Sequence, residues 1–308
     1  MIEHRFDGRV AIVTGSGRGL GRAYAHLLAS RGAKVVVNDT GAAISGDGAD
    51  VGPAEEVVRE IRDLGGEAVA TTASVATAEG GKAILDCALD TFGQIDIIVH
   101  NAGNVRHAPL EELSLEDFRA VLDVHMMGAF HVIRPAFPVM AKANYGRIVL
   151  VGSIGGLYGK AESMPYAVAK SGMIGMNNVI ALEGAAKGIK SNIILPGAMS
   201  RLGGLLDTTK FPPCGPELVA PVVGWLAHED CSITGEMLVS MAGRLARAFV
   251  AETEGMYLPS WSIEDVATNI DAVRGQENLW VFPPVPSGFS EHMGRSFEMA
   301  RNGMADAT

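Results

Sequence analysis

A glycine-rich turn near the start of the chain separates an apolar segment from an amphipathic one. The segment RVAIVTG is rich in β-branched residues and predicts a buried strand. After the turn TGSGRGLG, apolar residues recur at helical spacing from Leu20 to Leu28, and Gly32 ends the pattern. The segment AKVVVND then predicts a second buried strand. A strand, a turn, a helix and a strand in this order predict a βαβ unit.

Helix-like and strand-like segments continue to alternate along most of the chain. The periodicity predicts further elements, in chain order, at 55–65, 67–75, 80–93, 95–103, 115–140, 146–156, around Tyr166, and at 189–197, 217–229 and 236–243. Strands that are apolar throughout and alternate with helices predict an α/β fold, with a doubly wound parallel sheet and helices on both faces. We expect residues 1–243 to form a single catalytic domain.

The regular pattern weakens twice. Residues 198–213 carry few helix or strand signals and predict a loop over a substrate cleft. Residues 244–308 are amphipathic at first and then rich in proline, glycine and polar residues. We expect this second segment to be an extension that packs on the domain or on a neighbouring subunit.

Composition excludes several classes of function. With 48% hydrophobic and 19% charged residues, the chain is expected to be well packed and not disordered. A net charge of −10 argues against nucleic-acid binding, which needs clustered Lys and Arg. No apolar run has the length of a membrane span, and the first residues do not resemble a signal peptide. We therefore expect a cytoplasmic protein.

The cysteines and histidines give no sign of a metal site. Cys87, Cys214 and Cys231 are odd in number and widely spaced, which favours free thiols over disulfides or a zinc site. The eight histidines show no metal-ligand spacing, so we expect no catalytic metal.

The glycine-rich turn has the position of a dinucleotide-binding loop. Glycines let the backbone approach a pyrophosphate at the positive end of a helix. Asp39 ends the second strand, where a carboxylate can accept hydrogen bonds from an adenosine ribose and would repel a 2′-phosphate. This favours NAD over NADP, although Arg18 could pair with such a phosphate, and Asp39 could also be a solvated turn residue. The candidate cofactor-binding residues of the turn are Gly15, Ser16, Arg18, Gly19, Leu20 and Gly21.

Tyr166 and Lys170 stand four residues apart in the segment SMPYAVAKSG. On a helix they share one face, so the Lys170 ammonium could favour the phenolate of Tyr166. Lowering a tyrosine pKa from about 10 to neutrality needs about 4 kcal/mol, and a cation about 5 Å away supplies about 3 kcal/mol of it. The alternative is an amphipathic pair on the surface of a helix.

Five motifs occur in an order that resembles the short-chain dehydrogenase/reductase family: TGSGRGLG, NAG at 101–103, Ser153, YAVAK, and PG at 196–197. The resemblance covers about residues 6–243. It implies a Rossmann-type fold with a seven-stranded sheet, a bound NAD(P), and oxidation or reduction at a carbinol or carbonyl carbon. Within the family the chain is most similar to the (3R)-hydroxyacyl-CoA dehydrogenase region of peroxisomal multifunctional enzymes of type 2 and their bacterial relatives. That similarity is carried by VVVND with the glycine-rich insertion after it, by VHMMGAFHVIRPAFPVM, and by residues 219–249.

The resemblance also implies roles for individual residues. Tyr166 would exchange the hydroxyl proton, Ser153 would hold the same oxygen, and Lys170 would bind the nicotinamide ribose. His125 stands where most members have an asparagine that helps hold a proton-relaying water, and the alternative is a histidine that only packs. His100 replaces another common asparagine and is expected to be structural. Further cofactor contacts are implied for Ser74, where the family often has an acid, and for Val75, Asn101, Ala102, Gly103, Tyr166, Lys170, Pro196, Gly197 and Met199.

These residues predict an NAD-dependent dehydrogenase of a secondary alcohol on a bulky lipid-like substrate. We expect (3R)-3-hydroxyacyl-CoA ahead of a hydroxysteroid, with Arg106, Lys160, Arg201 and Lys210 as candidates to bind the phosphates of CoA. A dinucleotide-binding regulatory protein without turnover is the hypothesis from another class, and the intact Ser153, Tyr166 and Lys170 argue against it. The resemblance implies a homodimer or homotetramer.

Overall fold

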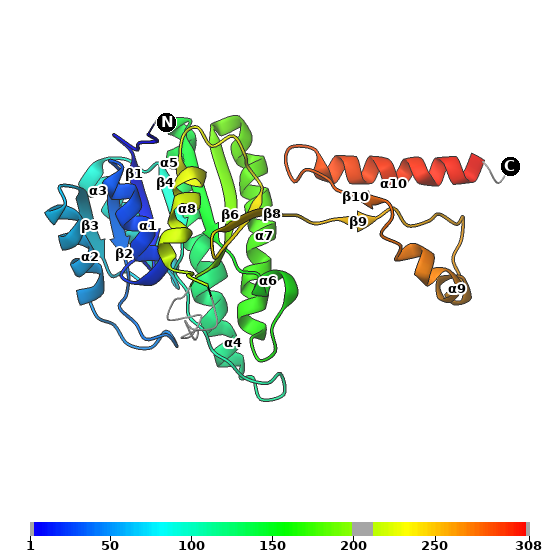
Figure 1. Ribbon diagram of the computed structural model, residues 1–308, viewed down its shortest axis with the longest axis horizontal. Coiled ribbons are helices and arrows are strands. Elements are labelled where there is room, and N and C mark those ends of the chain that lie inside the picture. The colour runs from blue at the N-terminus through cyan, green and yellow to red at the C-terminus, as the bar shows by residue number, and fades with distance from the viewer. Residues whose placement is uncertain (1–2, 199–211, 306–308) are drawn as a thin grey trace. The chain divides into compact units, whose positions relative to one another are not determined.

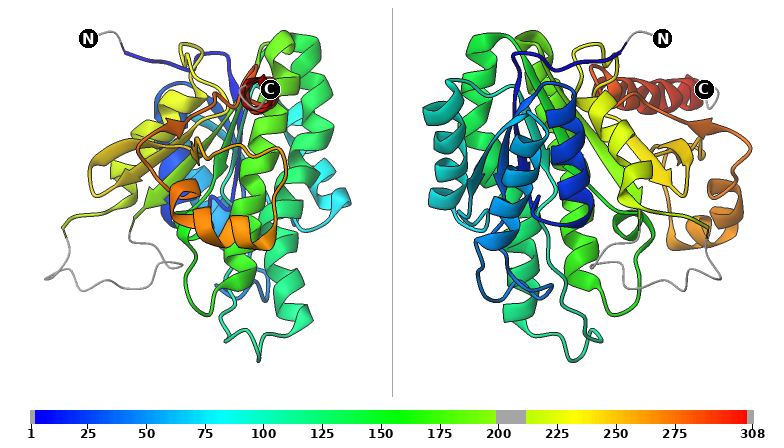
Figure 2. Two further views of the ribbon diagram at one scale, coloured as in Figure 1. Left: turned by 90° about the vertical axis from the view of Figure 1, so that its right-hand side faces the viewer. Right: turned by 60° about the vertical axis from the view of Figure 1, so that its left-hand side comes forward.

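The computed structural model describes residues 3–198 and 212–305. The chain forms two compact units, Met1–Arg247 and Ala248–Thr308, drawn in Figures 1 and 2. Each unit is described by itself below. Among the described residues, no helix is both long enough and apolar enough to span a bilayer.

The first unit is built on an eight-stranded sheet with the order β3-β2-β1-β4-β5-β6-β7-β8. All printed pairings from β3 to β7 are parallel, as expected for strands that are buried on both faces. The sheet strands are β1 Val10–Thr14, β2 Lys34–Asn38, β3 Glu67–Thr71, β4 Ile97–His100, β5 Gly146–Val151, β6 Ile189–Gly197, β7 Met237–Met241 and β8 Arg244–Ala248. The doubly wound parallel sheet predicted from the sequence is confirmed.

The expected count of seven strands is wrong by one. The residues between β7 and β8 are Ala242, with φ of 47°, and Gly243, with φ of 81°. Positive φ at both central residues is typical of a two-residue hairpin turn, which returns the chain antiparallel to β7. The segment RLARA does not alternate regularly between apolar and polar residues, so periodicity does not reveal it as a strand. The first compact unit ends at Arg247, within β8.

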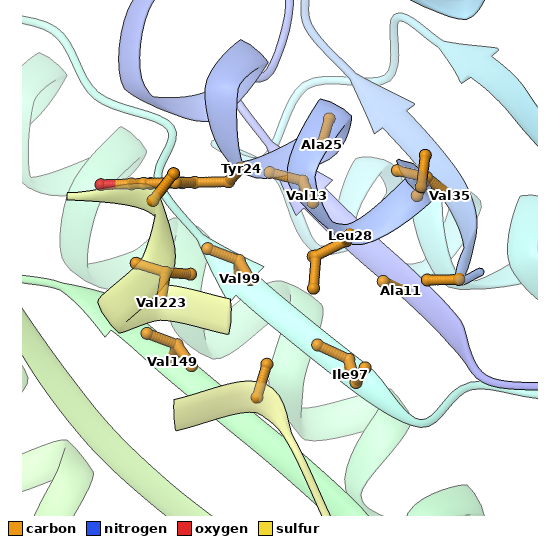
Figure 3. Packing of buried hydrophobic residues seen from close by; sticks show 14 of the residues in the cluster. Ala11, Val13, Tyr24, Ala25, Leu28, Val35, Ile97, Val99, Val149 and Val223 are labelled. Carbon is orange, nitrogen blue, oxygen red and sulfur yellow. The ribbon is translucent and has the colours of Figure 1, made fainter. Parts of the chain in front are cut away.

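Helices cover both faces of the sheet. Alternate strand residues such as Ala11, Val13 and Ile97 pack against α1, α2 and α8, and Figure 3 shows this core around Tyr24 and Leu28. The intervening strand residues point to the opposite face, because side chains alternate along a strand. That face carries α3, α5 and α7. The helices of the unit are α1 Gly19–Ser30, α2 Gly52–Asp63, α3 Ala78–Phe92, α4 Leu115–Leu122, α5 Gly128–Ala143, α6 Gly155–Tyr158, α7 Met164–Gly184 and α8 Ala220–Ala227, with short 3₁₀ turns η2 Ala185–Lys187 and η4 Pro216–Leu218.

The helix predicted at 115–140 is interrupted by a wider turn. Between α4 and α5, the residues of η1, Asp123–Met127, form a π-helix that contains His125. Such single π-helical turns inside α-helices are frequent at functional sites. The periodicity of the sequence does not reveal this turn.

The second unit contains a short antiparallel pair and two helices. Strand β9, Glu252–Thr253, pairs with β10, Leu279–Trp280, and the helices are α9, Ile263–Val273, and α10, Gly288–Ala305. Among residues 248–302, whose burial is described, only Gly288 is buried. This unit therefore has no hydrophobic core of its own, although its helices give the extension more regular structure than the sequence predicted.

Candidate active site

A cavity of about 390 Å³ lies at the carboxyl ends of β1 and β4. The chain leaves β1 toward β2 on one side and continues from β4 to β5 on the other, so this is the point where the strand order reverses. Ligands of doubly wound sheets bind in the crevice at such a point. Ten residues that the sequence singled out for cofactor binding line the cavity: Gly15, Arg18, Gly19, Leu20, Asp39, Ser74, Val75, Asn101, Ala102 and Gly103.

The glycine loop is shaped by close contacts that exclude side chains. A Cβ atom on Gly15 would lie 2.7 Å from Cα of Ala102, and one on Gly21 would lie 2.2 Å from the carbonyl oxygen of Gly15. Ser16 is buried, and its hydroxyl donates to the carbonyl of Val13 at 2.7 Å. Ser16 and Gly21 therefore shape the turn. The sequence predicted that both would contact the cofactor, but neither lines the cavity.

The amino end of α1 faces the cavity through Gly19 and Leu20. The residue before the helix, Arg18, provides no side-chain cap, and the first turn contains no acidic residue. The backbone N–H groups at this positive helix end suit the pyrophosphate of a dinucleotide. Arg18 forms no ion pair among the described residues, so its guanidinium adds positive charge at the same place.

Asp39 connects the glycine loop to the segment that follows β2. Its Oδ2 accepts a hydrogen bond from the Gly17 N–H at 2.8 Å, and its Oδ1 accepts one from the Gly41 N–H at 2.7 Å. Each carboxylate oxygen has a second lone pair, so both can still accept hydroxyl groups from a ligand. Asp39 lines the cavity and is half-buried, which does not fit a freely solvated turn residue.

Asn101 ties the ends of β1 and β4 together. Its side-chain amide donates to the carbonyl oxygens of Thr14 at 3.1 Å and Gly15 at 2.8 Å. Its backbone N–H and that of Ala102 donate to the Thr14 hydroxyl, each at 3.0 Å. These bonds fix the floor of the cavity.

Ser153, Tyr166 and Lys170 are brought together by β5 and the start of α7. Ser153 follows β5, and its hydroxyl accepts a hydrogen bond from the Gly155 N–H at 3.1 Å. The Lys170 Nζ lies 5.6 Å from the centre of the Tyr166 ring and donates to the carbonyl oxygen of Val151 at 2.5 Å. Lys170 is only 4% exposed, which excludes the interpretation of Tyr166 and Lys170 as a pair on a helix surface.

Burial dominates the protonation of this cluster. It lowers the pKa of Lys170 from 10.5 to about 7, because a charged ammonium is poorly solvated there. It also raises the pKa of Tyr166, and the Ser153 hydroxyl acts in the opposite direction. The expectation that Lys170 lowers the pKa of Tyr166 is therefore not met by the chain's own groups. The sequence could not show that Lys170 would be buried deeply enough to resist carrying a charge.

His125 lies beside Tyr166 in the interior. Its ring meets the Tyr166 ring edge to face, with centroids 5.3 Å apart, and its Nε2 lies 2.7 Å from the carbonyl oxygen of Asn104. The same Nε2 lies 3.1 Å from the backbone nitrogen of Asn104. The shorter contact with the carbonyl favours the tautomer in which Nε2–H donates to it, and Nδ1 is then an acceptor with no partner among the described residues. Burial keeps the pKa of His125 well below 6.5, so the ring is neutral.

His100 is a structural residue, as expected. Because the Thr14 hydroxyl accepts two backbone N–H groups, its own proton donates to Nδ1 of His100, which lies 3.2 Å away. The Nε2–H of His100 then donates to the carbonyl oxygen of His125 at 3.0 Å. Burial lowers the pKa of His100 to about 3, so this bridge from β1 to the π-helical turn is uncharged.

The remaining predicted site residues are placed less completely. Pro196 and Gly197 end β6, and Gly197 packs so closely on Met241 that a Cβ atom would lie 2.4 Å from its Cε. Met199, Arg201 and Lys210 lie outside the described residues, as does most of the loop predicted at 198–213. Lys160 is exposed, whereas Arg106 is paired with Asp47 and Asp117.

Sequence reasoning missed one wall of the cavity. The segment between β2 and α2 supplies a large part of the lining, namely Thr40, Ala42, Ala43, Ile44, Gly46, Gly48 and Ala49. The length and glycine content of this insertion were visible in the sequence, but they were used only as a sign of family resemblance. Asn38, Thr72, Asn104 and Val124 complete the lining.

Other chemically active side chains lie elsewhere. All three cysteines are free, and Cys214 and Cys231 are buried. Ligand-type atoms of His4, His228 and Asp230 lie within 4.8 Å of one another. The His228 ring already accepts the Asp230 N–H at Nδ1 and donates from Nε2 to the Arg5 carbonyl, so it holds the chain's first residues in place.

Residues 9–202 match the short chain dehydrogenase family. The chain belongs to the short-chain dehydrogenase/reductase family. Members of this family are oxidoreductases that act on CH–OH groups with a nicotinamide cofactor, and the glycine loop, the bare helix end and the cavity fit the adenosine half of such a cofactor. The family assignment confirms the Rossmann-type fold and the enzyme class that the sequence predicted.

Two similar sequences cover most of the chain. Peroxisomal multifunctional enzyme type 2 of Drosophila melanogaster is 46% identical over 265 residues, which are 86% of this chain and 44% of that protein. A putative short-chain type dehydrogenase/reductase of Mycobacterium tuberculosis is 42% identical over 84% of this chain and 91% of its own length. The chain thus spans less than half of the multifunctional relative and nearly all of the bacterial one.

Two solved structures are also similar to this chain over most of its length. The full-length Drosophila multifunctional enzyme superposes with a TM-score of 0.81 at 36% identity, over 97% of this chain and 50% of that chain. A short chain dehydrogenase from Mycobacterium avium superposes with a TM-score of 0.76 at 35% identity, over 91% of this chain and 98% of its own.

Proposed function

We propose that this short-chain dehydrogenase uses NAD to interconvert a secondary alcohol and a ketone on (3R)-3-hydroxyacyl-CoA. The observation that carries the proposal is that Ser153 and Tyr166, both half-buried, lie with the buried Lys170 in a chain that also has a cavity suited to a dinucleotide. The similarity to peroxisomal multifunctional enzyme type 2 supports an acyl-CoA substrate, and a hydroxysteroid is the alternative.

When bound, the nicotinamide accepts or supplies the hydride, and the chain's own residues handle the proton. Tyr166 takes the proton of the substrate hydroxyl as a general base and returns it in the reverse direction. Ser153 donates a hydrogen bond to the same substrate oxygen and stabilises the charge that develops on it. Because burial raises the pKa of Tyr166, its phenolate depends on a positive charge nearby during the reaction.

Lys170 and His125 extend the proton path behind Tyr166. With a pKa of about 7, Lys170 can both gain and lose a proton near neutrality, so it suits a relay better than a permanent cation. The free Nδ1 of His125 can accept a hydrogen bond from a bridging water, because the Asn104 carbonyl holds the proton on Nε2. Lys170 also binds the nicotinamide ribose in this scheme.

Asp39 is the basis for proposing NAD. Asp39 lines the cavity, and each of its oxygens keeps a free lone pair, so the carboxylate can accept hydrogen bonds from the ribose hydroxyls and would repel a 2′-phosphate. We expect Asp39→Ser to reduce the preference for NADH over NADPH by about 100-fold, since a hydrogen-bonded carboxylate contributes a few kcal/mol to such discrimination. Fluorescence titration with both reduced cofactors measures this ratio. Tighter binding of NADPH than NADH by the unaltered chain would contradict the proposed role.

A substrate panel tests the activity itself. The purified chain with NAD is expected to oxidise (3R)-3-hydroxyacyl-CoA thioesters, with a kcat/KM at least about tenfold above that for hydroxysteroids. The (3S) epimers serve as the matched control, because they differ only at the reacting carbon. Reduced nicotinamide is followed by its absorbance. If steroid alcohols were preferred, the alternative substrate would replace the acyl-CoA; if the chain bound NADH but no alcohol gave turnover, it would be a regulatory binding protein.

We extend the proposal to assembly and location. The second unit exposes large apolar side chains, including Ile263, Leu279 and Phe289, which supports packing of the C-terminal extension on the first unit or on a neighbouring subunit of a homodimer or homotetramer. Light scattering of the purified chain measures the oligomeric state. The cytoplasmic location stays a prediction that cell fractionation tests.

A further inference from the structure

The loop between β2 and α2, residues 40–50, forms one wall of the cofactor cavity (the blue loop below α2 in Figure 1). It is closed by its own backbone hydrogen bonds: the Asp50 N–H donates to the Thr40 carbonyl at 2.8 Å, and the Ala43 N–H donates to the Asp47 carbonyl at 2.8 Å. A Cβ atom on Gly41 would lie 1.9 Å from the Asp50 carbonyl oxygen, so the two ends of the loop meet tightly. The loop is therefore preformed and can move as one piece.

Residues that follow β4 attach this loop to the body of the first unit. The Val105 N–H donates to the carbonyl oxygen of Ile44 at 3.1 Å. The Arg106 guanidinium donates from Nε to the carbonyl oxygen of Ser45 and from Nη2 to Oδ1 of Asp47, each at 3.2 Å. The two residues that donate these three bonds, Val105 and Arg106, follow shortly after Gly103, which lines the cavity.

Arg106 also has a firm anchor on the opposite side. Its Nη1 donates to Oδ1 of Asp117 on α4 at 2.6 Å, and Ser114 donates to the other oxygen of that carboxylate. The Arg106 side chain is only 22% exposed, whereas Asp47 is 71% exposed. The guanidinium is thus fixed to α4 and bonds the movable loop with its remaining donors, an arrangement that the single ammonium of a lysine cannot reproduce.

We propose that Arg106 is a positioning residue for the cofactor, which slows release of the adenosine half by holding residues 40–50 against the segment after β4. A dinucleotide whose adenosine lies in this cavity cannot leave past the loop until the Val105 and Arg106 bonds break. The proposal rests on dinucleotide binding in the proposed function and does not depend on the identity of the alcohol. It assigns Arg106 to cofactor retention, where the sequence suggested a contact with CoA phosphates.

The test compares release of NADH from the full chain and its variants. We expect Arg106→Met to release NADH about tenfold faster, because interface changes act mainly on dissociation rates. Stopped-flow fluorescence with excess NAD as the displacing ligand measures the rate. KM for NAD should rise by a similar factor, KM for the alcohol should stay unchanged, and kcat should stay equal or increase. Asp47→Asn should accelerate release less, and Arg106→Lys should fall between Arg106→Met and the unaltered chain.

Arg5→Met is the matched control. Arg5 forms two hydrogen bonds with Asp7 before β1, at the opposite end of the strands from the cavity. It should release NADH at the unaltered rate. If Arg106→Met also released NADH at that rate, or raised KM for the alcohol as much as KM for NAD, the proposal would be overturned. Failure of the proposed function gives a different result: NADH release would respond to Arg106→Met, while no alcohol would be oxidised.

Discussion

Replacement of Tyr166 by phenylalanine is expected to lower kcat about 1000-fold, because the variant has no group to exchange the hydroxyl proton. The phenyl ring still fills the space beside His125, where the two rings meet edge to face. NADH affinity should therefore stay within about twofold of the unaltered chain. Steady-state turnover with the best alcohol of the panel and fluorescence titration with NADH measure the two quantities on the same preparations.

Tyr24→Phe provides the control for this experiment. Tyr24 is fully buried in the core that faces α8, and its hydroxyl has no hydrogen-bond partner among the described residues. Loss of this hydroxyl should leave kcat unchanged. If Tyr166→Phe kept more than about a tenth of the unaltered kcat, general-base catalysis by Tyr166 would be wrong, since removal of an acid–base group costs at least about 100-fold.

Replacement of Lys170 by methionine is expected to inactivate the enzyme and to stabilise its fold. Because the pKa of Lys170 in the folded chain is about 7, burial of this side chain costs free energy of folding at every pH at which the unfolded chain carries it as an ammonium. Methionine has a similar volume and no charge, although it leaves the Val151 carbonyl without its partner. We expect a net gain of about 2 kcal/mol in the free energy of unfolding at pH 6 and a kcat at least about 100-fold lower.

The pH dependence distinguishes this explanation from simple repacking. Because the folded-state pKa of Lys170 lies below the unfolded value of 10.5, the unfolded chain binds more protons between about pH 7 and 10.5. The contribution of Lys170 to stability is therefore most unfavourable at and below pH 7, and it diminishes as the pH rises through that window. The advantage of Lys170→Met should be smaller at pH 9 than at pH 6.

Urea unfolding followed by circular dichroism at both pH values measures this advantage. Lys82→Met removes an exposed lysine that pairs with Asp86, and it should change stability by less than about 0.5 kcal/mol at either pH. A Lys170→Met variant less stable than the unaltered chain at pH 6 would contradict our account. It would show that interactions of the Lys170 ammonium in the folded chain outweigh the free-energy cost of its burial.

Local sequence patterns predicted the structural features that depend on interactions between residues close together in the chain. The strand before the glycine loop, the tight turn that its glycines form, and the helical spacing of Tyr166 and Lys170 all follow from neighbouring residues. The carboxyl ends of parallel strands meet at one edge of a sheet, so the cofactor cavity also followed once the strands were recognised.

Features set by tertiary contacts were not predictable in the same way. The direction of the Tyr166 pKa shift depends on how deeply α7 packs. The π-helical turn at His125 contacts His100, which is 25 residues away in the sequence. The attachment of residues 40–50 by Arg106 joins positions about 60 apart in sequence, and nothing local to either segment reveals it. The strand β8 was missed because its residues alternate too weakly between apolar and polar.

That last strand determines how the protein can be shortened. A chain cut at residue 243 would leave the backbone N–H and C=O groups along one side of β7 unpaired, next to the apolar side chains of Met237, Leu238 and Val239. An exposed apolar edge of this kind invites pairing between molecules and leads to aggregation. With β8 present, the outermost strand carries Arg244 and Arg247, whose charges discourage such pairing. A soluble catalytic fragment should therefore end no earlier than the last residue of β8.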